Sequence, residues 1–282
     1  ANFDDILSNR TIDAVVVATL PFTHAQCAIK ALNKGKHVFV EKPMAMNLTD
    51  AQAMIRAAKK NKRILMVGHL LLFHPAVKKI KSYINEGILG DIRYLYSTRV
   101  NLGQVRSEES ALWSLTAHDI SVAVHFLNQR PKMVSVTGMS YIRKNIEDVV
   151  FMTLKFKNSV AAHIHASWLD PHKMRKFTIV GSKRMAIFDD MESSEKVRLY
   201  DKGVDWQQDG STYETFLTLR EGDIHIPKIE MLEPLKLECQ HFIDCIQKNM
   251  EPLTNGDGGL EVLRVLNAAQ KSLDDHGANV KV

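Results

Sequence analysis

The first third of the chain alternates short apolar runs with stretches that have the spacing of amphipathic helices. The apolar runs occupy residues 14–19, 38–41 and 64–67. Unbroken runs of this kind are typical of strands buried on both faces of a parallel sheet. Capping-box pairs, Thr23 with Gln26 and Thr49 with Gln52, predict where the two intervening helices begin. The order strand, helix, strand, helix, strand predicts one half of a doubly wound nucleotide-binding sheet.

A helix is predicted from Pro75 to Asn85, and beyond it the hydrophobic period changes to two. Apolar and polar residues alternate over residues 92–101, which predicts a long strand. Further strands are predicted at residues 133–141, 148–156, 160–168, 176–180 and 185–189. Lys157-Asn158-Ser159 and Gly181-Ser182 match hairpin connections, so we expect an antiparallel meander. Two amphipathic helices close the chain.

These patterns predict an α/β part followed by an α+β part. Residues 1–90 would form the C-terminal half of a Rossmann parallel sheet, and residues 91–282 an α+β domain with a large open, mainly antiparallel sheet. No G-x-G-x-x-G occurs among the fourteen glycines, although that turn is the usual cradle for a pyrophosphate. We therefore expect either that the chain is a fragment of a longer product or that the half sheet serves another purpose.

Composition narrows the class of protein. The chain has 282 residues, a net charge of +5 and a pI near 9.0, which suits anionic ligands such as dinucleotides or sugar nucleotides. Nucleic acid is a poorer fit, because the basic residues are scattered and no reading motif accompanies them. No apolar run approaches a membrane span. The three cysteines have no metal-ligand spacing, so we expect a reduced, cytoplasmic protein.

Lys42 is the first candidate for chemistry. Glu41-Lys42-Pro43 ends the second apolar run, where a strand should leave the sheet. Ligands of open α/β sheets bind outside the carboxyl ends of the strands. An ammonium there can hydrogen-bond a substrate hydroxyl and stabilise the alkoxide that develops as hydride leaves. The competing interpretation is an ordinary surface lysine.

His118 is the second candidate. Thr116-Ala117-His118-Asp119 precedes an apolar helical pattern, which predicts Thr116 as the N-cap and Asp119 at position N3. A histidine in the first turn feels the positive end of the helix dipole, which disfavours the imidazolium. A neutral imidazole near pH 7 is what a general base requires. The competing interpretation is a partly buried histidine packed under Trp113.

Other histidines fit no metal template. His24, His69 and His74 are expected near the same strand ends and together could line a crevice, but their spacing matches no metal site, and we predict none. His163 and His165 share one face of a strand and are interpreted as sheet surface or an interface.

The chain resembles the Gfo/Idh/MocA oxidoreductases. The resemblance rests on residues 13–19 with Pro21 and His24, on 35–43, on 67–69, on 89–92, and on 112–113 with 118–121. It implies an NAD(P)-binding Rossmann domain followed by a substrate-binding and oligomerisation domain on an open sheet. It also implies that Lys42 and His118 act at the reacting carbon, and that Thr19, Pro21, His24 and Glu41 join Lys42 along the nicotinamide half of NAD or NADP.

One departure concerns the catalytic histidine. Members of the family commonly carry Asp-x-Gly-x-His, whereas this chain has Ser114-Leu115-Thr116-Ala117-His118. A conventional Asp-His relay would therefore need Asp119 or Glu41 to substitute for the missing carboxylate.

Within the family, residues 101–103, 112–114 and 118–121 resemble the branch that oxidises the 3-hydroxyl of UDP-N-acetylglucosamine-type sugars in surface-polysaccharide pathways. The resemblance makes Arg99 and Arg106 plausible diphosphate partners, and His69 and Asp119 complete the predicted substrate residues. Solvated arginines are the competing interpretation. A non-catalytic sensing or regulatory relative and an inositol or simple sugar dehydrogenase are the rival functions. We expect a homodimer or homotetramer through the open sheet.

Overall fold

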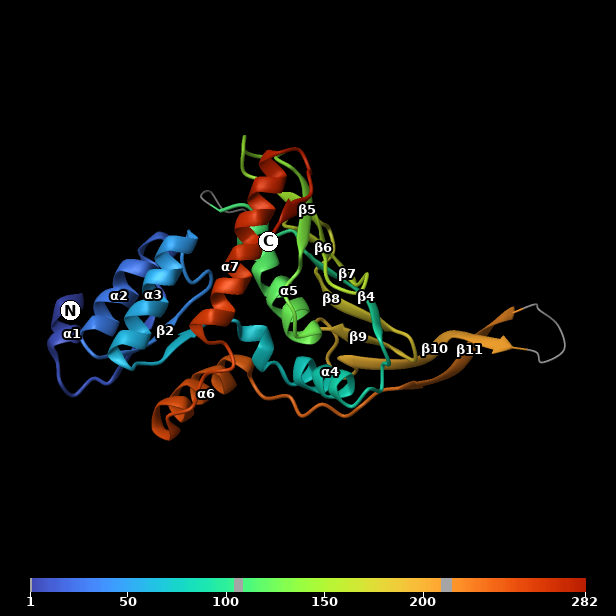
Figure 1. Ribbon diagram of the computed structural model, residues 1–282, viewed down its shortest axis with the longest axis horizontal. Coiled ribbons are helices and arrows are strands. Elements are labelled where there is room, and N and C mark those ends of the chain that lie inside the picture. The colour runs from blue at the N-terminus through green and yellow to red at the C-terminus, as the bar shows by residue number, and fades with distance from the viewer. Residues whose placement is uncertain (1, 104–108, 209–214) are drawn as a thin grey trace.

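The computed structural model describes residues 2–103, 109–208 and 215–282, and its strands form two separate sheets (Figure 1). A three-stranded sheet lies near the N-terminus and a nine-stranded sheet makes up most of the rest. The predicted fold class, a half Rossmann sheet followed by a mainly antiparallel open sheet, is confirmed.

The small sheet is parallel, in the order β1-β2-β3. Its elements, with the short helix before it, are α1 (Phe3–Ser8), β1 (Ala14–Val17), η1 (Pro21–Thr23), α2 (His24–Asn33), β2 (His37–Val40), α3 (Leu48–Asn61) and β3 (Leu65–Val67). The prediction of burial on both faces holds for β2 and β3 and is wrong for β1. Among the described strands β1 is an edge strand, and Val16 there is 61% exposed.

Both predicted capping boxes are wrong. Thr23 has helical backbone angles, and its hydroxyl donates to the Leu20 carbonyl at 2.8 Å instead of capping α2. The cap of α3 is Asn47, whose side chain accepts a hydrogen bond from the Asp50 amide at 2.9 Å. Asparagine is as good an N-cap as threonine, and here it lies two residues earlier.

The large sheet has the order β11-β10-β9-β8-β4-β7-β6-β5-β12. Its strands are β4 (Ile92–Val100), β5 (Met133–Met139), β6 (Val149–Lys155), β7 (Ala161–Ser167), β8 (Met174–Gly181), β9 (Met185–Asp189), β10 (Val197–Gln208), β11 (Thr215–His225) and β12 (Val280–Lys281). The predicted strands are all present, but β4 lies between β7 and β8 and runs parallel to β7. The simple meander is therefore wrong, because one early strand separates two later ones.

The hairpin β10–β11 and the short strand β12 were not predicted. The hairpin extends away from the body of the molecule in Figure 1. The predicted turn at Asn158-Ser159 is confirmed, since both residues have positive φ, +56° and +58°, as a tight hairpin turn requires.

Helices cover one face of the large sheet (Figure 1). They are α5 (Ala111–Leu127), α4 (Pro75–Asn85), which follows η2 (Leu70–Phe73), and the C-terminal part of α7 (Gly256–Asp274). The opposite face carries exposed aromatic side chains, among them Tyr94, Tyr96 and Phe151. His163 and His165 lie on this outer face, in agreement with their interpretation as sheet surface, and there they pair with Tyr96 and Phe151 of the neighbouring strands.

The last two long helices return to the small sheet. Helix α6 (Pro234–Lys248) places Phe242 against Phe39 of β2, with ring centroids 5.7 Å apart. The first turn of α7 packs on β3, where Gly259 is buried and leaves no room for a side chain. A Cβ at Gly259 would lie 2.6 Å from Val67 and 2.9 Å from the Met44 sulfur. The two sheets therefore share α7.

Gly259→Ala should destabilise the protein by about 1–3 kcal/mol, because the added methyl group overpacks a buried contact. Gly258→Ala is the matched control. That glycine lies in the same turn and is exposed, and its Cβ would meet only the Asn255 side chain at 3.3 Å. Urea unfolding monitored by circular dichroism measures both. Equal stabilities for the two variants would contradict this account of the packing.

Candidate functional site

Lys42 lies beyond the carboxyl end of β2, two residues after the strand. The Lys42–Pro43 peptide bond is cis. The Lys42 Nζ donates a hydrogen bond to the Ser114 carbonyl oxygen in the first turn of α5, at 3.0 Å. An ammonium from the small sheet is thereby held against the helix that carries His118.

His118 lies in the middle of α5, in its third turn. The predicted N-cap at Thr116 is wrong, because the helix begins at Ala111 after Ser110, and the Thr116 hydroxyl donates back to the Leu112 carbonyl at 2.6 Å. The helix dipole therefore does not explain a neutral imidazole. The pKa of His118 is nevertheless held well below its ordinary value of 6.5, first by burial and then by the nearby charges of Arg99 and Lys42.

Neither expected carboxylate reaches the His118 ring. The buried His118 Nδ1 has no hydrogen-bond partner among the residues that the structure describes. Asp119 accepts two hydrogen bonds from Arg99, at 2.7 and 3.2 Å, and Glu41 accepts one from the Lys42 amide at 3.2 Å. The condition for a conventional Asp-His relay, that Asp119 or Glu41 substitutes for the missing aspartate, is therefore not met among the described residues.

Arg99 and Asp119 form a buried bidentate ion pair, with side chains 13% and 3% exposed. The hydrogen bonds between Arg99 and Asp119 thus engage two side chains that were predicted to bind the substrate. Arg175, which the sequence did not suggest, is the cross-strand neighbour of Arg99 between β8 and β4. It also lowers the pKa of His118, although less than burial does. No local motif could have identified it, because the β4–β8 register joins residues 76 positions apart.

His69 follows β3 and is 4% exposed. Neither of its ring nitrogens has a hydrogen-bond partner in the described structure. Burial, and then the charge of Lys42, lower the pKa of His69 to about 4. His69 in turn lowers the pKa of His118, although less than burial, Arg99 and Lys42 do. Lys42 and His69 therefore both lie close enough to His118 to disfavour its charged form.

The predicted nicotinamide residues lie on the turns that follow β1 and β2. Thr19 is exposed and its hydroxyl is 2.6 Å from that of Thr23, while Pro21 begins η1. His24 is 1% exposed, and its two ring nitrogens lie 2.8 Å from the Pro43 carbonyl and 3.0 Å from that of Thr19. His24 therefore ties the two turns together and offers no spare nitrogen to a ligand.

Glu238 is a buried carboxyl that the sequence did not single out. It lies on α6, is 1% exposed, and its Oε1 has no hydrogen-bond partner among the described residues. Burial, and then the charge of Glu41, raise the pKa of Glu238 to about 8. Its spacing, three residues after Leu235 and four before Phe242, places it on the apolar face of the helix and could have identified it as buried.

The remaining candidates lie away from this centre or outside the described structure. His74 caps α4 and lies 3.5 Å from Asp190, whose pKa it lowers to about 2 by hydrogen bonding. Arg106 falls outside the described residues. Within residues 2–103, 109–208 and 215–282, no group of three metal-ligating side chains could hold an ion, and no helix is long and apolar enough to cross a bilayer. All three cysteines are free.

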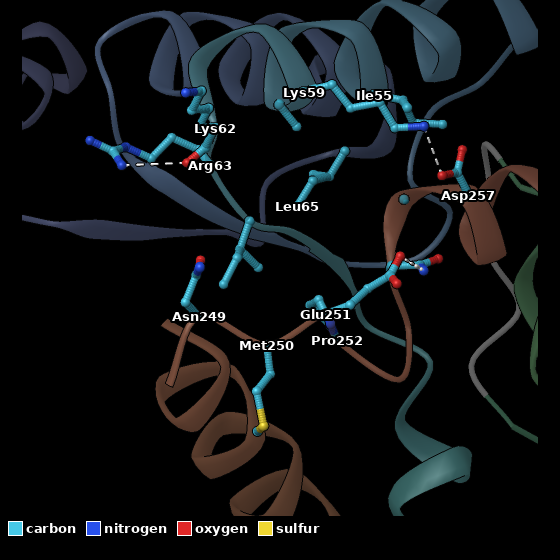
Figure 2. A pocket seen from close by; sticks show the side chains of 14 residues that line it. Ile55, Lys59, Lys62, Arg63, Leu65, Asn249, Met250, Glu251, Pro252 and Asp257 are labelled. Carbon is cyan, nitrogen blue, oxygen red and sulfur yellow. Dashed lines mark hydrogen bonds and ion pairs between the residues drawn. The ribbon is translucent and has the colours of Figure 1, made fainter. Parts of the chain in front are cut away.

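A cavity of about 300 Å³ lies at the other end of β3, shown in Figure 2. Residues from the end of α3, the start of β3 and the segment between α6 and α7 line it. Its charged groups are exposed. Lys59 pairs with Asp257 at 2.9 Å, with side chains 68% and 57% exposed, and such pairs contribute little. This cavity is separate from Lys42, His69 and His118.

Two family models match successive parts of the chain. The model described as "Oxidoreductase family, NAD-binding Rossmann fold" matches residues 1–69, and the "GFO/IDH/MocA C-terminal domain" matches residues 77–187. Together they match well over half of the chain.

Three relatives illustrate the range of activities. The 2,7-anhydro-N-acetylneuraminate hydratase of Escherichia coli is 29% identical over 57% of this chain and 47% of its own, so the chain matches about half of its length. The myo-inositol 2-dehydrogenase of Thermotoga maritima is 26% identical over 96% of this chain and 80% of its own. The UDP-N-acetylglucosamine 3-dehydrogenase of Acidithiobacillus ferrooxidans is 24% identical over a match that covers 89% of this chain and 76% of the relative. A crystal structure of that enzyme superposes with a TM-score of 0.81 at 21% sequence identity, and the match covers 98% of this chain and 82% of that one. At this identity the match shows a common fold alone.

The buried His69 should make the protein sensitive to acid. Its pKa is about 4 in the folded state against 6.5 ordinarily, so below pH 6.5 the unfolded chain binds a proton that the folded chain does not. Falling pH therefore favours unfolding, and His69 should remove about 3 kcal/mol of stability by pH 4.

His69→Phe should flatten the fall in unfolding free energy between about pH 7 and pH 4.5. His172→Gln, which removes an exposed histidine, is the control and should leave the slope as it is in the wild type. Urea titrations at several pH values measure the slope. An unchanged slope in His69→Phe would show that His69 titrates as it does in the unfolded chain.

Proposed function

Because the chain belongs to the Gfo/Idh/MocA family of oxidoreductases, we propose that it oxidises a secondary hydroxyl of a sugar, with NAD or NADP as hydride acceptor. The observation that carries this proposal is the hydrogen bond from the Lys42 ammonium to the Ser114 carbonyl, one helical turn before His118. This bond supports the proposal because it holds a cation one turn of α5 away from a histidine whose pKa is held low.

The two side chains have complementary roles in this proposal. His118 is neutral at pH 7 because burial, Arg99 and Lys42 lower its pKa, so it can accept the hydroxyl proton as a general base. Lys42 can donate a hydrogen bond to the same oxygen and stabilise the negative charge that develops there. The hydroxyl loses its proton to His118 while the carbon loses hydride, which leaves a carbonyl group.

The residues around Lys42 fit the nicotinamide end of the cofactor. The turns after β1 and β2 are tied together by His24, and Gly68 allows the chain to approach Glu41 closely, since a Cβ there would lie 3.1 Å from the carboxylate. Thr19, Pro21 and Glu41 would line this end, and when bound the nicotinamide supplies the hydride acceptor. The printed sequence has no glycine-rich turn for the diphosphate.

For the substrate we propose a sugar nucleotide of the UDP-N-acetylglucosamine kind. The sequence likeness to the Acidithiobacillus ferrooxidans enzyme supports it, as do the guanidinium groups of Arg99 and Arg175 near His118. His69, Arg99 and Asp119 remain the proposed substrate contacts. Of these, His69 has both ring nitrogens unpartnered, whereas Arg99 would contact a diphosphate only with N–H groups not used by Asp119. An inositol or simple sugar is the alternative, supported by the Thermotoga maritima relative.

Lys42→Ala should lower kcat by roughly 10²-fold or more, the scale expected for a positioned acid–base group. Lys30→Ala, an exposed lysine of α2, is the matched control and should retain wild-type turnover. The assay measures the reduction of NAD or NADP with each member of a panel of UDP-sugars, inositols and free sugars. It identifies the substrate and gives the turnover rate of each variant. Equal turnover in the two variants would remove Lys42 from the mechanism.

A non-catalytic sensing protein is the rival from another class. Calorimetric titration of the chain with NADH and with a UDP-sugar separates the two functions. Binding of both ligands supports the dehydrogenase. Binding of the sugar without the dinucleotide would favour the sensor.

We also propose that the outer face of the large sheet joins two or four copies of the chain. Tyr94 and Tyr96 there are 46% and 40% exposed, and Phe151 stacks on His165 with centroids 4.5 Å apart. An apolar patch of this kind on an open sheet is typical of an interface. Light scattering should return a dimer or tetramer for the wild type and a smaller species for Tyr96→Glu. A wild-type monomer at micromolar concentration would refute the proposal.

A further inference from the structure

A row of charged side chains crosses the ends of three neighbouring strands on the helix-covered face of the large sheet. Arg99 of β4 lies directly opposite Arg175 of β8 in the strand register. Asp190 follows β9, and its amide donates a hydrogen bond to the Arg175 carbonyl at 2.9 Å. Side chains alternate along a strand, so Arg99 and Arg175 share a face with Leu95 and Phe177, which belong to the hydrophobic core. The two arginines are therefore on the side of the sheet where α5 packs.

This row adjoins the proposed catalytic histidine. Arg99 donates two hydrogen bonds to Asp119, at 2.7 and 3.2 Å, and Asp119 is the residue after His118 on α5. Opposed Cα atoms of antiparallel strands lie about 4.5–5.5 Å apart, so Arg175 is the immediate neighbour of that ion pair. The charge of Arg175 also lowers the pKa of His118, which agrees with this placement.

The two arginines differ in what they can still offer to a ligand. The Arg99 side chain is 13% exposed, and its Nε and Nη2 both donate to Asp119. The Arg175 side chain is 44% exposed, and its Nη1 lies 3.5 Å from Asp190 Oδ2. That separation exceeds the roughly 2.7–3.2 Å of an ordinary N–H···O hydrogen bond. The guanidinium fork of Arg175 is therefore open to a ligand, whereas that of Arg99 is mostly engaged.

Asp190 anchors Arg175 without neutralising its surroundings. The same carboxylate lies 3.9 Å from the Lys196 ammonium and 3.5 Å from His74 Nε2. Lys196 also donates a hydrogen bond to the Asp190 carbonyl at 2.9 Å. Two cations, Arg175 and Lys196, thus share one carboxylate, and the Arg99–Asp119 pair beside them is neutral as a whole. This group of residues keeps an excess of positive charge, which attracts an anion.

We propose that Arg175 recognises an anionic group of the substrate, so that the sugar oxidised at Lys42 and His118 carries a phosphate or a carboxylate. The proposal rests on the proposed function. A guanidinium fork matches the paired oxygens of either group. The diphosphate of a sugar nucleotide and the carboxylate of a uronic acid offer this same chemistry. A neutral inositol or free sugar would leave Arg175 without a partner.

Arg175→Gln should raise KM for an anionic substrate by roughly 10- to 100-fold, the range expected for lost charge-assisted hydrogen bonds, and should leave kcat nearly unchanged. The substrates to compare are UDP-N-acetylglucosamine and glucuronate, which are anionic, and N-acetylglucosamine and myo-inositol, which are neutral. Turnover of the neutral pair should change little. Arg175→Lys keeps the charge without the planar fork and should recover only part of the affinity.

Arg184→Gln is the matched control and should retain the wild-type KM. Its side chain is 42% exposed and lies 3.6 Å from Asp201, much like the Arg175 pair, but it follows the opposite end of β8. Circular dichroism checks the fold of each variant, and Arg175→Lys serves as the test if Arg175→Gln does not fold. A wild type that prefers the neutral sugars, or an Arg175→Gln loss equally large for them, would overturn the assignment.

A second measurement needs no turnover. Calorimetric titration with UDP and with glucuronate measures anion binding alone and distinguishes a diphosphate site from a carboxylate site. Arg175→Gln should weaken the binding of whichever anion the wild type takes by roughly 10- to 100-fold, and Arg184→Gln should not. Binding that depends on Arg175 without any dehydrogenase activity would contradict the proposed function and leave the anion site standing. Binding of neither anion, or binding unchanged in Arg175→Gln, would overturn the anion site.

Discussion

The hydrogen bond between the Lys42 ammonium and the Ser114 carbonyl joins the two halves of the molecule at the point where chemistry is proposed. Its partners lie 72 residues apart, one beyond a strand of the small sheet and the other in the first turn of α5. Helix α5 packs on the large sheet, so this bond, together with the shared helix α7, links the small sheet to the large one. His118 follows one turn later, and its surroundings depend on that link.

Burial of the ring is the largest influence on the pKa of His118. Burial and the cations Arg99, Lys42 and Arg175 disfavour the imidazolium, and they lower the pKa of His118 without any help from a helix terminus. Asp119 neutralises Arg99, and its loss would leave a buried guanidinium uncompensated. Glu238, whose pKa burial raises to about 8, adds no negative charge at neutral pH. The result is a centre that disfavours a second positive charge.

Membership of the family fixes the fold more firmly than the reaction. Relatives that match this chain include a hydratase as well as dehydrogenases of inositol and of a UDP-sugar. Fold does not imply function, so the reaction must be argued from the residues of the site. The residues proposed for this chain are Lys42, His118 and His69.

The sequence by itself determined most of the local elements and the fold class. Period-two alternation predicted β4, and apolar runs predicted β2 and β3. The turn at Asn158-Ser159 could also be predicted, because tight hairpin turns require positive φ, which few residues adopt. Only the tertiary structure decided the insertion of β4 between β7 and β8, the pairing of Arg99 with Asp119, and the burial of His69 and Glu238. The physical reason is range: propensity and periodicity act over a few neighbouring residues, whereas burial and charge pairing depend on segments that only the folded chain brings together.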